Sequence, residues 1–171
     1  MNSLKKIARG TIAMALLLWA PATQAQTALS RLMGGNANSP IAQAVTVPPG
    51  YITYYISGTP SGPARPDLPR TDPARMGDTP TQTTSSLNRL RDSLTQLGLT
   101  FGDVVKATVF LVGDPAKGGE IDFAGMNQSW SKEFGTAAQP NKPARSTIKV
   151  AGLATQGALV EIEMIAVKKA P

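Results

Sequence analysis

The sequence predicts an α+β domain in which one β-sheet carries two helices on one face, in the order β-β-α-β-α-β-β. Leucines recur at helical spacing on one side of residues 79–98, and a run of apolar and β-branched residues covers Val104–Val112. Residues 159–168 alternate between two sets of side chains, as a strand does. Because each expected helix is apolar on one side only, both are expected to cover the same face of the sheet.

The first 25 residues have the layout of a secretory signal peptide. Basic residues between positions 5 and 9 precede an apolar run from Thr11 to Ala20, and small residues follow up to Ala25. The apolar run is shorter than the roughly 20 residues that a membrane-spanning helix needs. We therefore expect cleavage after Ala25, a periplasmic or secreted protein, and no stable membrane anchor. An uncleaved anchor is the alternative.

Composition excludes several classes of chemistry. Loss of Lys5, Lys6 and Arg9 with the signal peptide lowers the formal charge from +6 to +3, which is too weak and too dispersed to indicate a nucleic-acid partner. The sequence has no histidine and no cysteine, and so lacks the usual zinc ligands and the usual imidazole and thiol catalysts. We expect no metal and no cofactor.

The chain after the signal peptide divides into a flexible leader, 26–42, and one domain, 43–171. The leader is rich in Gly, Asn, Ser and Ala without a sustained period. First strands are expected at 44–47 and, in a tyrosine-rich segment, at 51–57. A long proline-rich loop, 59–80, follows and is interpreted as mobile, with a functional loop as the alternative.

Both helices have recognisable ends. Thr79 is expected to cap the first helix, with Pro80 at its first position, Gln82 completing a capping box, and Gly98 ending it. Asp122 is expected to cap the second helix, which ends at Gly135. An aromatic and methionine stripe on this second helix indicates core packing, through Phe123, Met126, Trp130 and Phe134.

Strands at 146–151 and 159–168 are expected to pair as a terminal hairpin-like ribbon. One alternate set of the last strand is wholly apolar and belongs under the helices: Val160, Ile162, Met164 and Ala166. The other set combines Glu161 and Glu163 with apolar residues: Leu159, Ile165 and Val167. These apolar residues would form an exposed patch in a monomer, which favours self-association.

Arg145 and the two glutamates are the best candidates for chemistry. The guanidinium of Arg145, at the start of its strand, can bind a carboxylate through two parallel hydrogen bonds. It could equally form a structural ion pair, for instance with Glu161 or Glu163 of a neighbouring copy. Glu163 could also pair with Lys149 across the ribbon.

The segment Pro143-Ala144-Arg145-Ser146 and the pair Glu161-Ile162-Glu163 resemble motifs of the Rid family, the reactive intermediate deaminases or YjgF-like proteins. The resemblance continues upstream through 98–111 and 122–127 and covers roughly residues 50–168. It implies a chorismate-mutase-like fold and homotrimers with active sites in clefts between subunits.

The resemblance also assigns roles. It implies that Arg145 anchors a substrate carboxylate and that Glu161, with Glu163 as the alternative, positions the attacking water. Ser57 would contact the substrate, and Gly58 would let the backbone approach it closely. Asn127 matches a family asparagine; we expect it among the substrate-binding residues and interpret its role as structural rather than catalytic.

The activity that the resemblance implies is hydrolysis of 2-imino and 2-enamino acids to 2-keto acids and ammonia. The main alternative is non-catalytic binding of small carboxylates in the same cleft, and an endoribonuclease fits the composition poorly. Two departures from the family alter the pocket: Ile41 stands where an aromatic residue is usual, and Thr147 where cysteine is frequent.

Overall fold

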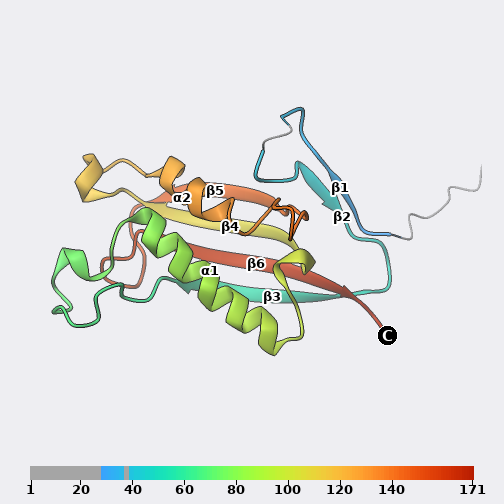
Figure 1. Ribbon diagram of the computed structural model, residues 1–171, viewed down its shortest axis with the longest axis horizontal. Helices are drawn as coiled ribbons and strands as arrows, with labels where there is room; N and C mark the ends of the chain where they lie inside the picture. The colour runs from blue at the N-terminus through green and yellow to red at the C-terminus, as the bar shows by residue number, and fades with distance from the viewer. Residues whose placement is uncertain (1–27, 37–38) are drawn as a thin grey trace, which may run out of the picture.

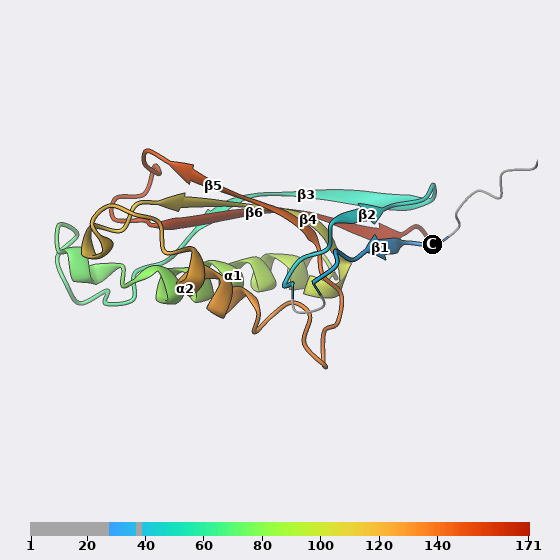
Figure 2. The ribbon, with the colours of Figure 1, turned by 90° about the horizontal axis from the view of Figure 1, so that it is seen from above.

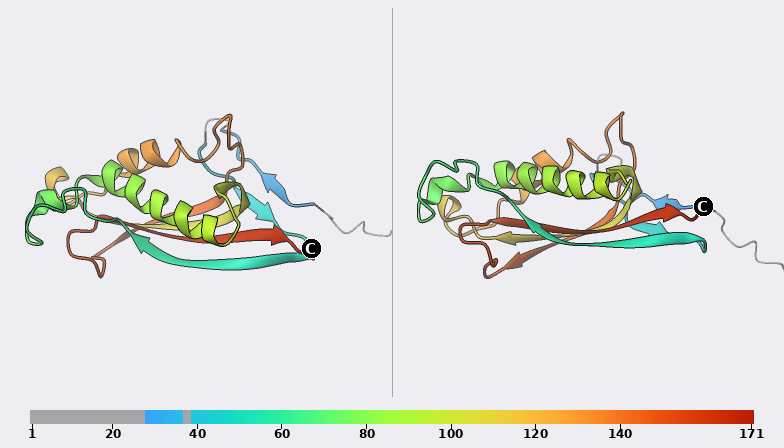
Figure 3. Two further views of the ribbon diagram at one scale, coloured as in Figure 1. Left: turned by 60° about the horizontal axis from the view of Figure 1, so that its bottom comes forward. Right: turned by 90° about the horizontal axis from the view of Figure 1, so that it is seen from below.

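The protein forms two layers, a twisted β-sheet and a layer of helices that covers one of its faces (Figures 1 and 3). The structure is a computed structural model that describes residues 28–36 and 39–171. The predicted signal peptide, 1–25, lies outside the described residues. The α+β class and the placement of both helices on one face are confirmed.

The main sheet has the strand order β3-β6-β4-β5. Its strands are β3 (Tyr51–Pro60), β4 (Val104–Val112), β5 (Ala144–Val150) and β6 (Val160–Lys169). β6 lies antiparallel to both β3 and β4, whereas β4 and β5 are parallel. The predicted pairing of the last two strands is therefore wrong. The chain crosses from β4 to β5 through α2, and such a crossover gives a parallel pair.

Helices α1 (Thr79–Gln96) and α2 (Phe123–Trp130) lie side by side over the same face of the sheet (Figure 3). Single turns of 3₁₀-helix occur in the connections, at Pro73–Arg75, Phe101–Asp103 and Pro115–Lys117. No helix among residues 28–36 and 39–171 is both long and apolar enough to cross a membrane.

The start of α1 differs from the prediction. The N-cap is Asp78, whose Oδ1 accepts a hydrogen bond from the Thr81 backbone N–H at 3.0 Å. Gln82 does not complete a capping box, because its buried side chain bonds to other segments instead. The other end agrees with the prediction: Gly98 follows the helix with a φ of +68°, a conformation that glycine adopts without strain.

α2 begins after its predicted cap, Asp122, but ends at Trp130 rather than near Gly135. Met126, Trp130 and Phe134 are fully buried as expected. Phe123 is not part of the core, since 47% of its surface is exposed. Phe123 is the first residue of α2 and lies outside the buried stripe that Met126, Trp130 and Phe134 form.

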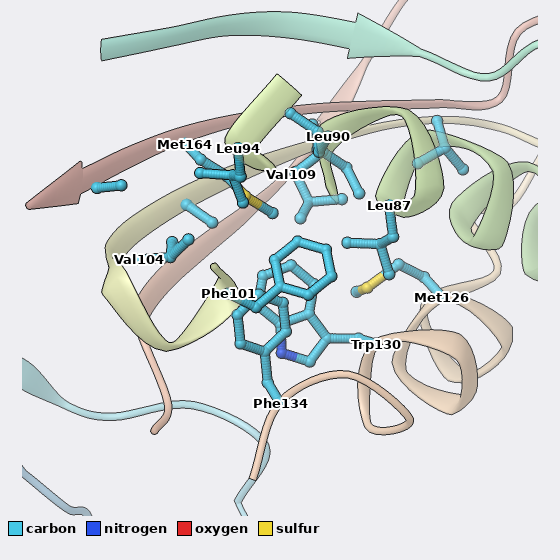
Figure 4. Packing of buried hydrophobic residues seen from close by; sticks show 14 of the residues in the cluster. Leu87, Leu90, Leu94, Phe101, Val104, Val109, Met126, Trp130, Phe134 and Met164 are labelled. Atoms are coloured by element: carbon cyan, nitrogen blue, oxygen red, sulfur yellow. The ribbon is translucent and has the colours of Figure 1, made fainter. Parts of the chain in front are cut away.

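The core fills the space between the helices and the sheet (Figure 4). The aromatic rings of Trp130 and Phe134 stack with centroids 4.3 Å apart, and Phe101 tilts against Phe134 at 4.9 Å. Leucines of α1 pack beside them, together with the predicted inward set of β6. Each such buried side chain contributes roughly 1.5–3 kcal/mol by leaving water.

The first two strands lie apart from the main sheet. β1 (Ser30–Leu32) pairs antiparallel with β2 (Ala44–Thr46). The sequence predicted irregular chain where β1 lies, and it placed the strand at 44–47 in the main sheet. Figure 2 shows β1 and β2 together at one end of the molecule.

The face of the sheet opposite the helices is uncovered (Figure 3). It is less apolar than predicted, because Leu159 belongs to the core and Val167 is only 3% exposed within one chain. Apolar side chains that remain open on this face include Tyr55 at 81% and Ile148 at 44%, whereas Ile52, at 45%, lies on the other side of β3.

Candidate functional site

Arg145, near the start of β5, points toward α2. Its Nη2 donates a hydrogen bond to Asn127 Oδ1 at 2.7 Å, and its Nη1 lies 3.6 Å from Met126 Sδ. The guanidinium carbon is 4.7 Å from the centre of the Trp130 ring and 5.9 Å from that of Phe123. The helix therefore supplies one polar partner and two aromatic faces that attract a cation.

Burial leaves the Arg145 cation short of partners. Desolvation lowers the pKa of Arg145 to about 10, and its Nε is buried without a hydrogen-bond partner. Within residues 28–36 and 39–171, no carboxylate forms an ion pair with it. A partly buried guanidinium that lacks a counter-charge favours binding of an anion.

The leader segment contacts the residues that surround Arg145. Trp130 Nε1 donates to Pro40 O at 3.1 Å, and the Ala42 N–H donates to Pro143 O at 3.0 Å. These bonds hold the segment containing Ile41 against α2 and against the start of β5. Ile41 thus lies beside the segment that carries Arg145.

A second group of predicted residues lies where β3 meets β6. The register shifts between Ile56 and Thr59, so Ser57 and Gly58 together form an irregularity in the strand. A side chain on Gly58 would collide with Glu161, because its Cβ would lie 2.1 Å from Glu161 Oε1. Glycine at this position is what lets the Glu161 carboxylate lie against the β3 backbone.

An open depression of about 390 Å³ lies on the uncovered face beside this irregularity. Ser57, Glu163 and Lys106 line it, together with Thr108. Lys106 Nζ donates a hydrogen bond to Ser146 Oγ of the neighbouring strand β5 at 2.8 Å. The depression therefore combines a carboxylate, an ammonium and hydroxyl groups.

Within one chain the structure separates Arg145 from Glu161. Arg145 pairs in register with Ala107, and so does Met164, which lies beneath the helices at 2% exposure. Neighbours in register point to the same face, so Arg145 shares the helix-covered side, while Glu161 alternates to the uncovered side. The structure thus joins Arg145 with Asn127, and Glu161 with Gly58.

The predicted pairing of Glu163 with Lys149 is wrong. Lys149 Nζ contacts Glu120 Oε2 at 3.1 Å instead, and β5 does not adjoin β6. Glu163 forms no ion pair within the part of the chain that the structure describes. Its carboxylate is exposed on the uncovered face.

Sequence reasoning missed two contributors. Lys106 interrupts an otherwise apolar strand, and a charge in that position is the signal that could have identified it. Trp130 was assigned to the core alone, whereas it also lies beneath the Arg145 guanidinium. No group of three or more carboxylates, histidines or cysteines that could hold a metal occurs among the described residues.

Comparison with known proteins relates the whole domain to one family. The family model described as Endoribonuclease L-PSP matches residues 37–168. A RutC family protein of Haemophilus influenzae is 35% identical over 133 residues, which are 78% of this chain and 90% of that protein. A protein of Escherichia coli named "Putative reactive intermediate deaminase TdcF" is 34% identical over 130 residues, covering 71% of this chain and 92% of its own.

Solved structures agree in fold. The Rid family protein YyfB of Yersinia pestis superimposes with a TM-score of 0.61 at 23% identity, over 82% of this chain and 98% of that chain. The protein PA3499 of Pseudomonas aeruginosa gives a TM-score of 0.54 at 22% identity, over 82% and 93%. From the extent of the family match and of these relatives, the chain belongs to the Rid/YjgF/RutC family, whose family model is described as Endoribonuclease L-PSP.

Proposed function

We propose that the protein hydrolyses 2-imino acids, formed from 2-enamino acids by tautomerisation, to 2-keto acids and ammonia. The observation that carries the proposal is the Arg145 guanidinium, which is partly buried on Trp130, held by Asn127 and left without a carboxylate partner in the described chain. Such a group binds the carboxylate of a small substrate through its two parallel N–H donors. The deaminase name of the Escherichia coli relative points to the same chemistry.

In the proposed reaction, Arg145 holds the substrate carboxylate and Glu161 accepts a proton from water as the water oxygen attacks the imine carbon. Glu161 then returns this proton to the substrate nitrogen, which gives a tetrahedral amino alcohol and restores the carboxylate. Transfer of the hydroxyl proton to the nitrogen lets ammonia leave and gives the 2-keto acid. The reaction involves no oxidation or reduction, so water is the only co-substrate that it requires. Ser57 and Gly58 would border the substrate on the side of Glu161.

Because Arg145 and Glu161 lie on opposite faces in one chain, the proposal requires a second copy to complete the site. We propose the homotrimer that the sequence indicated, in which the uncovered sheet face of one subunit, with its Glu161, packs against the edge strand β5 of the next, with its Arg145, and the substrate lies between them. The exposed Tyr55 and Ile148 on this face support association. Light scattering at micromolar concentration should give about three times the monomer mass; a stable monomer would contradict the shared site.

The test of the activity couples an amino-acid oxidase, as the source of imine, to detection of the keto acid, with semicarbazide competing for free imine. Wild type should shorten the lifetime of the imine. Arg145→Ala should abolish the acceleration, and Arg145→Lys should lower kcat/KM by more than about tenfold, because a lysine keeps the charge but not the fork. No acceleration by wild type over spontaneous hydrolysis would refute the deaminase proposal.

The two glutamates can be distinguished in the same assay. Glu161→Gln keeps shape and hydrogen bonding, so keto-acid binding should survive while turnover falls. Glu163→Gln is the matched control on the same strand and should retain turnover. The reverse result would move the water-positioning role to Glu163.

Non-catalytic binding of small carboxylates is the second candidate, and the separation of Arg145 from Glu161 favours it. It predicts saturable keto-acid binding that depends on Arg145 without any release of ammonia. A ribonuclease activity, which the family description names, would need RNA binding that weakens steeply with salt. A salt-titrated RNA-binding measurement tests that alternative.

We also propose export, with cleavage after Ala25. The basic, apolar and small-residue layout of the first 25 residues supports it. Mass spectrometry of protein from the periplasmic or secreted fraction should find Gln26 as the first residue. Protein that still carries residues 1–25 would contradict cleavage.

A further inference from the structure

The proline-rich loop after β3 borders an open cavity of about 380 Å³ that is separate from the groups described above. Its walls come from this loop and from the loop between β5 and β6, which lie at the same end of the molecule (Figure 1). The lining residues that matter for recognition are Arg70, Arg75, Met76, Thr155 and Gln156. None of them contributes to the proposed deaminase site.

The charge of the cavity is one-sided. Two arginines line it and no carboxylate does. The acids of the same loop are engaged elsewhere: Asp67 pairs with Arg65 at 3.3 Å, and Asp72 Oδ1 accepts from the Ala74 N–H at 2.8 Å. The cavity therefore presents positive charge without an internal counter-ion.

The donors that face the cavity are unused. Arg70 makes no hydrogen bond or ion pair within residues 28–36 and 39–171. Arg75 uses Nη1 on loop carbonyls, at 2.7 Å from Pro66 O and also on Leu68 O, and so keeps Nε and Nη2 for another acceptor. Arg75 is held in place by the loop, and Arg70 is free to close on a ligand.

Gln82 fixes the walls relative to each other. Its side chain is completely buried, and its Nε2 donates to Gly77 O at 2.9 Å and to Gly157 O at 3.1 Å. Its Oε1 accepts from Ser61 Oγ at 3.0 Å and from the Leu159 N–H at 2.7 Å. One side chain thus ties the end of β3, the proline-rich loop and the β5–β6 loop together, which holds the cavity open before any ligand arrives.

The floor of the cavity is apolar. Met76 is 7% exposed and packs against Gly157, where an added Cβ would lie 3.0 Å from Met76 Cγ. A φ of +76° also favours glycine at this turn. A cavity of this size with an apolar floor and a few convergent donors is typical of a site for a small organic molecule.

We propose that this cavity binds a small organic anion whose phosphate or carboxylate oxygens are held by Arg70 and Arg75, with the body of the molecule over Met76. Thr155 and Gln156 supply additional hydrogen-bonding groups at the opposite wall. The site lies on the single chain and does not depend on the deaminase proposal.

The test is isothermal titration calorimetry of the full chain with two probes, inorganic phosphate and succinate. Saturable binding of one probe per chain is expected, and the preferred probe distinguishes a phosphate ligand from a carboxylate ligand. Arg70→Gln should weaken that binding by about tenfold or more, because a charged hydrogen bond is lost. The variant breaks no bond within the described chain and should unfold at the wild-type temperature.

Arg65→Gln is the matched control, since it removes an arginine of the same loop that does not line the cavity and already has a partner. It should bind the probe as wild type does. Arg145→Ala should also leave this binding in place, which separates the cavity from the proposed catalytic arginine. Absence of saturable binding of both probes, or equal binding by Arg70→Gln and wild type, would overturn the proposal.

Discussion

Replacing Asn127 by aspartate tests whether Arg145 is an unfilled anion site. Burial lowers the pKa of Arg145 from its ordinary value to about 10, which corresponds to about 3 kcal/mol lost by its charged form. Asn127 Oδ1 already lies 2.7 Å from Arg145 Nη2, so Asn127→Asp places a negative charge at hydrogen-bond distance without moving the chain. The free energy of unfolding at pH 7 should rise by about 1–2 kcal/mol, measured by urea denaturation.

The same variant should lose its ligand. An internal carboxylate competes for the guanidinium, so the affinity for a 2-keto acid should fall at least about tenfold by calorimetry. The introduced carboxyl has a lowered pKa beside Arg145, so its stabilisation is present above its unfolded pKa of about 4 and is lost as the pH falls through the folded value.

An exposed pair of the same kind provides the control. Asn88 Oδ1 accepts from Arg91 Nη1 at 2.6 Å on the outer side of α1. Asn88→Asp should change the free energy of unfolding by less than about 0.5 kcal/mol and should leave keto-acid affinity unchanged. If Asn127→Asp binds the keto acid as tightly as wild type, Arg145 does not anchor the ligand and the reasoning fails.

Three further variants test other parts of the structure. Gly58→Ala should displace the Glu161 carboxylate and lower turnover by about tenfold or more with little change in melting temperature; normal turnover would argue against a role for Glu161. Gln82→Leu should cost about 3 kcal/mol in urea unfolding, because four hydrogen bonds are lost, two of them to the buried Ser61 and Leu159. Asp78→Ala should cost about 1 kcal/mol at pH 7. The hydrogen bond from Thr81 lowers the pKa of Asp78, so this cost should be constant above pH 4 and disappear as the pH falls below the folded pKa; a cost that persists at pH 2 would contradict the cap.

Local signals in the sequence were sufficient for most of the elements. The apolar run Val104–Val112 forms β4 with those bounds, and Gly98 ends the first helix, because both features depend on neighbours in the chain. The predicted pairing of the last two strands is wrong, because the alternation in β6 is compatible with either neighbour. The succession of a strand, a helix and a strand within residues 104–150 is the sequence signal for the parallel pair β4–β5.

For the candidate site, too, local signals identified the residues but not their positions in the fold. Arg145 and Glu161 stood out by residue type and motif, but the faces they occupy depend on tertiary register. The cap of the first helix was placed one residue late because Asp78 and Thr79 are both good capping residues, and only the backbone distinguishes them. Gln82 fitted a capping motif, but its bonding partners lie in distant segments that local spacing does not reveal.

Hydrogen bonds between the leader and the domain make the leader part of the structure that surrounds Arg145. Arg31 donates to Lys142 O at 3.0 Å and to Gly102 O at 3.1 Å, and Pro40 O receives the indole N–H of Trp130. A protein shortened to residue 43 would keep every strand of the main sheet yet lose the acceptor that orients the indole beneath Arg145. If Arg145 anchors the substrate as proposed, a change in the leader can alter the site while the sheet, the helices and the arginine itself stay the same.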